Sequence, residues 1–176
     1  MSTAGWTPDE LAAWLRLLGT PQIGAVTARR LLAAFGDPRA LFDAGPSAWA
    51  EVAGDATAAA LRQPPDLLPA LADATWRWLD AASAEPHHLL TLADPAYPAA
   101  LLQTADPPLL LYAIGRVDLL QAPSIAVVGS RNPTPQGAEN ARAFAAAFSR
   151  AGLTVVSGLA LGIDGAAHEG ALSGPG

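Results

Sequence analysis

The chain of 176 residues contains no cysteine and no lysine, since all ten of its basic residues are arginines. Without cysteine, disulfide bonds and thiolate metal sites are impossible. Without lysine, a Walker A loop cannot form, because its lysine must reach the phosphates. No apolar run approaches the length of a membrane span, and residues 1–6 show neither a basic region nor an apolar signal core. We therefore expect a cytoplasmic protein that makes no contact with a membrane.

Positive charge is also scarce, because 16 acidic residues outweigh 10 arginines and leave a formal net charge of −6. This balance argues against broad, non-specific coating of nucleic acid. It leaves room for a focused site, because Arg29, Arg30, Arg131, Arg142 and Arg150 can form local positive patches on an acidic body. Hydrophobic residues make up 51% of the chain, which is ample for one packed domain or two small ones.

The N-terminal part of the chain predicts a compact helical domain. Thr7-Pro8-Asp9-Glu10 combines a capping threonine, a first-turn proline and a glutamate at the capping-box position. Residues 21–36 follow the pattern of a helix-hairpin-helix, with an apolar–glycine–apolar turn before a helix that ends near Gly36. Gly24 and Arg29 of this hairpin are candidates for a DNA contact, but we favour a scaffolding or protein-contact role. Further helices are predicted from residues 37 and 46 and over 64–82.

Residues 83–86 form the predicted joint between a helical domain over 1–83 and a second domain over 84–176. Strand signals alternate with helical patterns in the second domain, which indicates an α/β fold with a mostly parallel sheet. The predicted strands lie at 89–92, 109–112, 125–128 and 154–156, and the predicted helices at 137–151 and 163–173.

Two of these strands run into small, glycine-bearing loops. Gly129-Ser130-Arg131 follows the first, and Ser157-Gly158-Leu159-Ala160-Leu161-Gly162-Ile163-Asp164 follows the second and opens a helix. Carboxyl ends of parallel strands share one edge, and such loops offer bare backbone N–H groups to anions. The pattern predicts phosphate recognition, with Arg131 as the charged contact. It lacks the G-x-G-x-x-G fingerprint, and Val155 excludes a G-x-S-x-G nucleophile elbow.

For the loop residues, a purely structural role is open beside phosphate contact. The glycines admit the phosphate or serve only tight turns, and the serines donate hydroxyls or cap helices. Asp164 and His168 share one helical face and are too few for a metal site, so we expect Asp164 to shape its loop and His168 to support it or touch the ligand. No catalytic residue, metal or cofactor is predicted. The predicted DNA- or phosphate-binding residues are Gly129, Ser130, Arg131, Ser157, Gly158, Gly162, Asp164 and His168.

These loops resemble those of the DNA-processing protein A family (DprA, also called Smf). Gln136 departs from the family pattern, in which an aromatic residue is frequent at this position. The resemblance also extends upstream, to the segment that leads into the family's Rossmann-like domain. It is carried by Gly129-Ser130-Arg131 with Pro133-Thr134 and Gly137, by Ser157-Gly158-Leu159-Ala160 with Gly162-Ile163-Asp164 and His168, and by Asp94-Pro95-Ala96-Tyr97-Pro98 and Asp106-Pro107-Pro108.

The resemblance implies an N-terminal all-helical SAM-like (helix-hairpin-helix) domain followed by an incomplete Rossmann-like, mostly parallel sheet. It implies single-stranded DNA binding through phosphate-cradling loops, loading of the RecA recombinase in natural transformation, and no enzymatic activity. It also implies a homodimer in the full-length protein. Because the chain ends where the third strand of that domain is expected, we expect it to be a fragment of a longer protein.

Two other classes of function remain open. The same loops suit a Rossmann-like domain that binds free nucleotides, either as a sensor or as an enzyme that cleaves nucleoside monophosphates. Such an enzyme needs a positioned acid, and Asp164 is the only candidate in the two loops. The helical domain by itself also suits a protein-interaction module.

Overall fold

The structure is a computed structural model that describes residues 5–175, so residues 1–4, at the start of the segment searched for a signal, lie outside it. The chain divides into two compact units, of which the first ends at Arg116 and the second begins at Val117. The predicted domain boundary at residues 83 and 84 stays a prediction. None of the helices in the described part of the chain has the length and hydrophobicity needed to cross a membrane.

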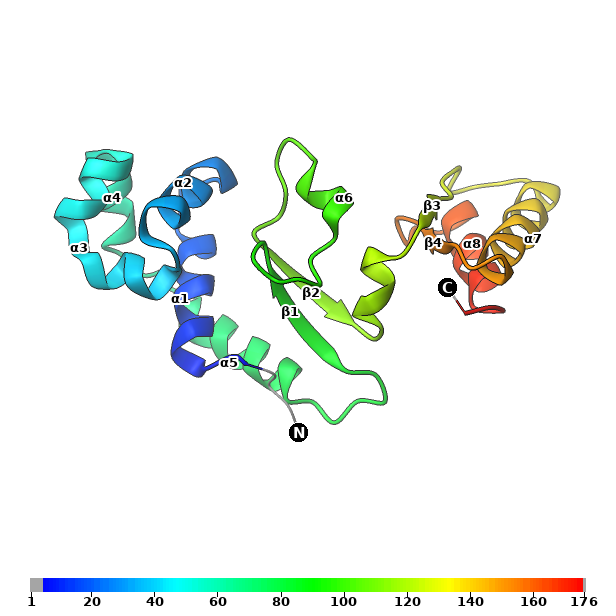
Figure 1. Cartoon of the computed structure of the whole chain (residues 1–176), viewed down its shortest axis with the longest axis horizontal. Coiled ribbons are helices and arrows are strands. Elements are labelled where there is room, and N and C mark those ends of the chain that lie inside the picture. Colours follow the sequence, from blue (N-terminus) through cyan, green and yellow to red (C-terminus); the bar gives the residue numbers. More distant parts are fainter. Residues whose placement is uncertain (1–4, 176) are drawn as a thin grey trace. The chain divides into compact units, whose positions relative to one another are not determined.

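Five helices open the first unit (Figure 1). Thr7 caps the first helix as predicted, because its hydroxyl accepts a hydrogen bond from the Glu10 N–H at 3.2 Å. The third helix is broken at Gly45, whose φ of 80° is left-handed, so a second helical segment begins at Pro46. The helices are α1 (Pro8–Gly19), α2 (Ala25–Phe35), α3 (Pro38–Ala53), α4 (Asp55–Leu61) and α5 (Leu68–Leu79).

A two-stranded hairpin completes the first unit. β1 (His87–Thr91) pairs antiparallel with β2 (Leu110–Ile114), and neither pairs with the strands of the second unit. The prediction of one mostly parallel sheet is therefore wrong for these two strands. A parallel pair is usually joined by a crossover helix that covers the sheet, whereas the only helix in this connection is the four-residue α6 (Ala99–Leu102).

The hairpin packs into the helical cores rather than beside them. Leu109 belongs to a buried cluster with Trp14 and Leu31. Leu89 belongs to a second buried cluster with Leu11 and further leucines of α1 and α5. Helices and hairpin therefore share their hydrophobic cores, which explains why the first compact unit extends beyond the helices.

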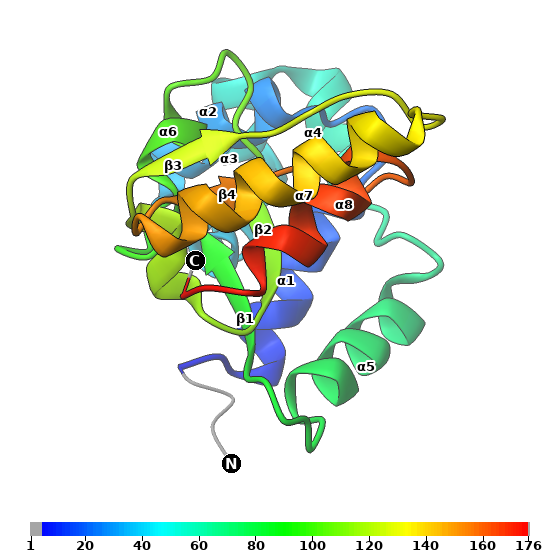
Figure 2. The same ribbon diagram turned by 90° about the vertical axis from the view of Figure 1, so that its right-hand side faces the viewer.

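The second unit contains the parallel pair that the sequence predicts. β3 (Ser124–Ala126) lies parallel to β4 (Thr154–Val156), with Ile125 opposite Val155. Two helices, α7 (Pro135–Arg150) and α8 (Ile163–Ala171), lie side by side (Figure 2). A short 3-10 helix, Val117–Gln121, precedes β3. Small side chains line the contact of the two helices with the strands. The buried cluster consists of Ala145, Val155, Ala167 and Ala171.

The two helices approach each other closely at Gly170. A Cβ atom on Gly170 would overlap the carbonyl oxygen of Arg142 and lie 2.9 Å from its carbonyl carbon. The buried Ser149 hydroxyl donates a hydrogen bond to the Ala171 carbonyl at 2.9 Å. Arg142 also pairs with Glu169 at 2.7 Å, and this hydrogen bond raises the pKa of the guanidinium. This contact fixes α8 against α7 and so positions the loop from which α8 begins.

Candidate phosphate-binding site

The loops that follow β3 and β4 meet in the second unit. The first loop comprises residues 127–134 and the second loop residues 157–162. The Val127 N–H donates to the Val156 carbonyl at 3.0 Å, which continues the strand pairing into both loops. The Ser130 carbonyl then accepts a hydrogen bond from the N–H of Ile163, the first residue of α8, at 3.1 Å. The structure therefore brings the two loops together, at the start of α8.

Three of the predicted site residues are glycines, and a side chain would collide at two of them and crowd its neighbour at the third. A Cβ atom on Gly129 would come within 2.7 Å of the Ile163 side chain. Gly162, with a left-handed φ of 89°, lies against the backbone of Ser130 and Arg131, and Gly158 lies over the Asp164 carboxylate. Packing between the loops therefore requires Gly129 and Gly162, whatever further contact they make with a ligand.

The two serines of the site differ in how their hydroxyls are used. The Ser157 hydroxyl donates its proton to the Val127 carbonyl at 2.7 Å, so this donor already holds the two loops together. The Ser130 hydroxyl accepts a hydrogen bond from the Asn132 N–H at 3.0 Å. Its own proton is not committed by that bond. Ser130, which is exposed, is therefore the serine that can donate to a ligand in this conformation.

Arg131 is exposed in the first loop and forms no ion pair among residues 5–175. Two of the other arginines considered for positive patches, Arg142 and Arg150, lie differently. Arg142 is paired with Glu139 and Glu169, each within 2.9 Å. Arg150 ends α7, a helix of 16 residues that is about 24 Å long. Of these three arginines, Arg131 is the one presented by the loops.

Asp164 lies beneath the second loop and not on its surface. Its side chain is buried, and Oδ2 accepts a long hydrogen bond from the Ala160 N–H at 3.4 Å. His168 follows one helical turn later, and its buried Nε2 has no hydrogen-bond partner within residues 5–175. The described residues contain no group of three or more acidic, histidine or cysteine side chains arranged to hold a metal ion.

The second loop also carries two exposed leucines, which were not among the predicted site residues. Leu159 and Leu161 are almost fully exposed, and Leu159 has a left-handed φ of 57°. A signal was present in the sequence, because two leucines alternate with small residues in a loop that otherwise suits an anion. Their exposure and the left-handed backbone depend on the folded loop, and the pattern alone predicts neither.

Arg29 of the helix-hairpin-helix is held within the first unit. Its Nη1 donates to Asp106 Oδ1 at 2.7 Å and to the Pro107 carbonyl at 3.3 Å. Gly24 caps α2 without a side-chain hydrogen bond and is exposed. The ion pair ties α2 to the segment before β2, and this arrangement favours the scaffolding role of the hairpin over DNA contact by Arg29.

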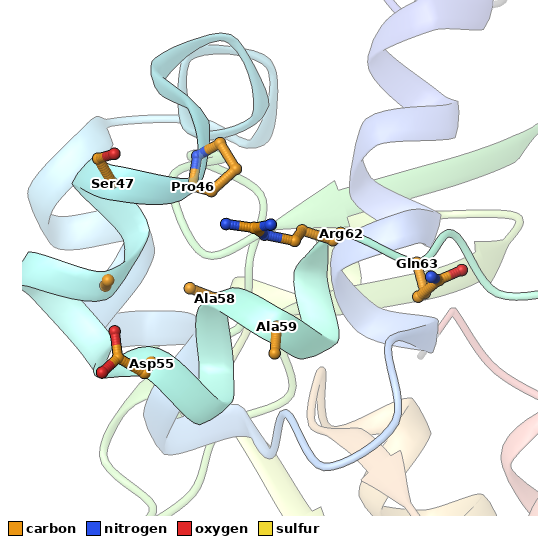
Figure 3. A pocket seen from close by; sticks show the side chains of 8 residues that line it. Pro46, Ser47, Asp55, Ala58, Ala59, Arg62 and Gln63 are labelled. Atoms are coloured by element: carbon orange, nitrogen blue, oxygen red, sulfur yellow. The ribbon is translucent and has the colours of Figure 1, made fainter.

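The first unit also contains a pocket of about 360 Å³ between the second segment of α3 and α4 (Figure 3). Arg62 extends across it toward Pro46, while Asp55 lies at the opposite end. Three alanines and one proline share its wall with four polar or charged side chains. It is lined by Pro46, Ser47, Ala50, Asp55, Ala58, Ala59, Arg62 and Gln63.

The chain is similar to several curated proteins. The chain is 33% identical over 171 residues to Protein Smf of Synechocystis, across 93% of this chain and 42% of that protein. It is 43% identical over 86 residues to DNA processing protein DprA of Streptococcus pneumoniae, across 49% of this chain and 30% of that protein. The chain therefore spans less than half the length of these two curated relatives.

A solved structure and two family models agree with this relationship. The X-ray structure of DNA processing protein A from Streptococcus pneumoniae matches 92% of this chain and 53% of its own, with a TM-score of 0.66 and 27% identity. Residues 8–65 match the model of the DprA-like N-terminal HHH domain. These matches confirm the predicted fold class, a helical domain followed by a small α/β sheet region. Residues 88–176, half of the chain, match the model of DNA recombination-mediator protein A. The chain therefore belongs to the DNA recombination-mediator protein A family.

Proposed function

We propose that this chain binds single-stranded DNA by its backbone phosphates, between the first and second loops. The observation that carries the proposal is Arg131, an exposed arginine without an ion pair in residues 5–175, next to the point where the two loops meet. A guanidinium donates two parallel hydrogen bonds to a phosphate. The name of the family and that of the pneumococcal relative, DNA processing protein DprA, support DNA as the source of that phosphate.

The remaining site residues divide into contacts and supports. Ser130 donates its free hydroxyl, and the backbone of Gly129, Gly158 and Gly162 approaches the phosphate together with the positive end of the α8 dipole. Ser157 and Asp164 hold the second loop in shape through their bonds to Val127 and Ala160. His168 supports the same helix. Phosphate contacts position a strand without reading its bases, so sequence preference is slight.

We further propose that the site carries no bond-making chemistry. A catalytic acid or base must lie within hydrogen-bond reach of the reacting group. Asp164, the only carboxylate considered for that role, is buried beneath the loop and bonded to a loop amide. This placement favours DNA binding over cleavage of a nucleoside monophosphate.

The wider role follows the family resemblance. In the cell, the proposed activity is DNA processing in natural transformation, in which the protein loads RecA onto the bound strand. The full-length protein acts as a homodimer in the cytoplasm. These parts of the proposal rest on the resemblance of the loops and on the relatives, and the site geometry carries only the DNA contact.

Two arginine variants test the proposal. Arg131→Ala should weaken binding of labelled oligo-dT, measured by fluorescence anisotropy, by roughly 10- to 150-fold, the equivalent of losing a charge-assisted hydrogen bond of about 1.5–3 kcal/mol. Arg150→Ala removes the same charge from the far end of α7 and should change affinity by less than about threefold. Unchanged affinity in folded Arg131→Ala protein, or tighter binding of mononucleotides than of oligo-dT, would contradict the proposal.

Salt dependence provides a second test of the same contact. Each phosphate contact on a single strand should contribute about −0.7 to the slope of log K against log salt, because counterions are released. Arg131→Ala should therefore make the slope shallower by roughly that amount, and mixed sequence should compete about as well as poly-dT. A flat salt response in the unmutated chain would show that phosphates are not the ligand.

A further inference from the structure

The second loop presents two leucines to solvent in the middle of the proposed phosphate site. The side chains of Leu159 and Leu161 are 79% and 83% exposed. Ser157 and Gly158 precede them directly and Gly162 follows, so both lie within two residues of the proposed phosphate contacts. Val128, which precedes Gly129 in the first loop, is also exposed. An apolar surface therefore adjoins the polar contacts on the same loops.

Leu159 is held in an unfavourable backbone conformation. Its φ of 57° is left-handed, which costs a residue with a Cβ atom about 1–2 kcal/mol relative to the right-handed region. The loop keeps this conformation because it is fixed on both sides of Leu159, by Ser157 to Val127 and by Ala160 to Asp164. Such strain is concentrated at ligand sites, where surrounding structure maintains it.

We propose that Leu159 and Leu161 form an apolar contact surface for the nucleobases of the strand whose phosphates lie on the two loops. The inference rests on the proposed function, because a base is covalently joined to the nucleotide whose phosphate is bound. Unpaired bases expose flat faces that pack on apolar side chains without regard to sequence. In a duplex these faces are stacked on neighbouring bases. The leucines thereby select single strands over duplex DNA.

The test compares three ligands of equal length: oligo-dT, an abasic oligonucleotide with the same phosphates, and duplex DNA. The variants are Leu159→Ala, Leu161→Ala and the double variant, measured in the 176-residue chain. Leu172→Ala is the matched control, because Leu172 is 85% exposed but follows the last residue of α8, about 13 Å from the loop. Circular dichroism confirms that each variant is folded.

We expect the double variant to bind oligo-dT on the order of tenfold more weakly, from partial loss of apolar burial at two leucines. Its affinity for the abasic strand and for duplex DNA should stay the same, and Leu172→Ala should match the unmutated chain on every ligand. Unchanged binding of oligo-dT would overturn the proposal. So would an equal loss on the abasic strand, because the leucines would then only hold the loop.

A protein partner is the competing occupant of these leucines. If the double variant keeps its affinity for oligo-dT but self-associates less in sedimentation experiments, the surface contacts a second copy of the chain and the proposal is wrong. Failure of the proposed function is distinguishable from this result. Arg131→Ala should weaken binding of oligo-dT and of the abasic strand alike, whether or not the leucines contact bases.

Discussion

Replacing Gly170 by alanine should destabilise the second unit, although alanine is the better helix former. The new Cβ would overlap the Arg142 carbonyl oxygen and lie 2.9 Å from its carbonyl carbon and 3.0 Å from its Cα. Overpacking costs about 1–3 kcal/mol, and the upper end applies because the obstacle is backbone that cannot rotate away. The higher helix propensity of alanine offsets about 1 kcal/mol of this cost. We therefore expect the free energy of unfolding of the second unit to fall by about 2 kcal/mol.

Gly165→Ala is the matched control within the same helix. A Cβ atom at Gly165 meets only the Ala160 carbonyl oxygen, at an ordinary 3.6 Å, so this variant should gain about 0.5–1 kcal/mol. Hydrogen exchange of α7, α8 and β4 amides reports the second unit. All five tryptophans lie between Trp6 and Trp78, so their fluorescence follows the first unit and should be unchanged in both variants. Gly170→Ala protein with amide protection equal to that of the unmutated chain would refute the close contact between the helices.

Four further variants probe contacts of both units. Tyr97→Phe should cost about 1 kcal/mol at pH 7, because the buried phenol donates to the Pro108 carbonyl at 2.6 Å. Burial raises the pKa of Tyr97. The stability contributed by its protonated form is therefore present below the unfolded pKa of about 10 and is lost as pH rises through the folded pKa. Urea midpoints of the unmutated chain and of Tyr97→Phe should converge above about pH 10. Ser130→Ala should weaken oligo-dT binding without changing amide protection, whereas Ser157→Ala should lower both. Arg29→Ala should lower the urea midpoint followed by tryptophan fluorescence and leave oligo-dT affinity unchanged; weaker DNA binding would restore the hairpin as a DNA contact.

Most helices were predictable because their signals are local. Thr7 with Pro8 starts α1, and Thr134, whose hydroxyl caps α7, precedes Pro135 in the same way. The antiparallel pairing of β1 and β2 was not predictable from an α/β alternation. Strand partners are chosen by non-local packing, and the residues between the strands carry no periodic pattern that reveals how short α6 is.

In the candidate site, too, the local features were predictable and those that depend on distant residues were not. Glycine, serine and arginine after two apolar strands identify the loops from local sequence. The hydrogen bonds within the site join residues about 30 positions apart. The Ser157 hydroxyl donates to the Val127 carbonyl, and the Ile163 N–H donates to the Ser130 carbonyl. The sequence therefore leaves open which hydroxyl is free and why Gly129 has no side chain. The left-handed backbone of Leu159 is likewise a property of the closed loop.

The hairpin of the first unit limits where recombination between relatives can join two sequences. Apart from His87, its strands fall within the segment matched by the second family model, residues 88–176, yet Leu89 and Leu109 complete cores built by helices of the N-terminal part. The Trp6 indole also donates to the Leu89 carbonyl at 3.2 Å. A recombination junction between residues 65 and 88 thus separates side chains that pack together. Chimeras of relatives joined there should need compensating changes in the hairpin, whereas a junction after Arg116 leaves both cores intact.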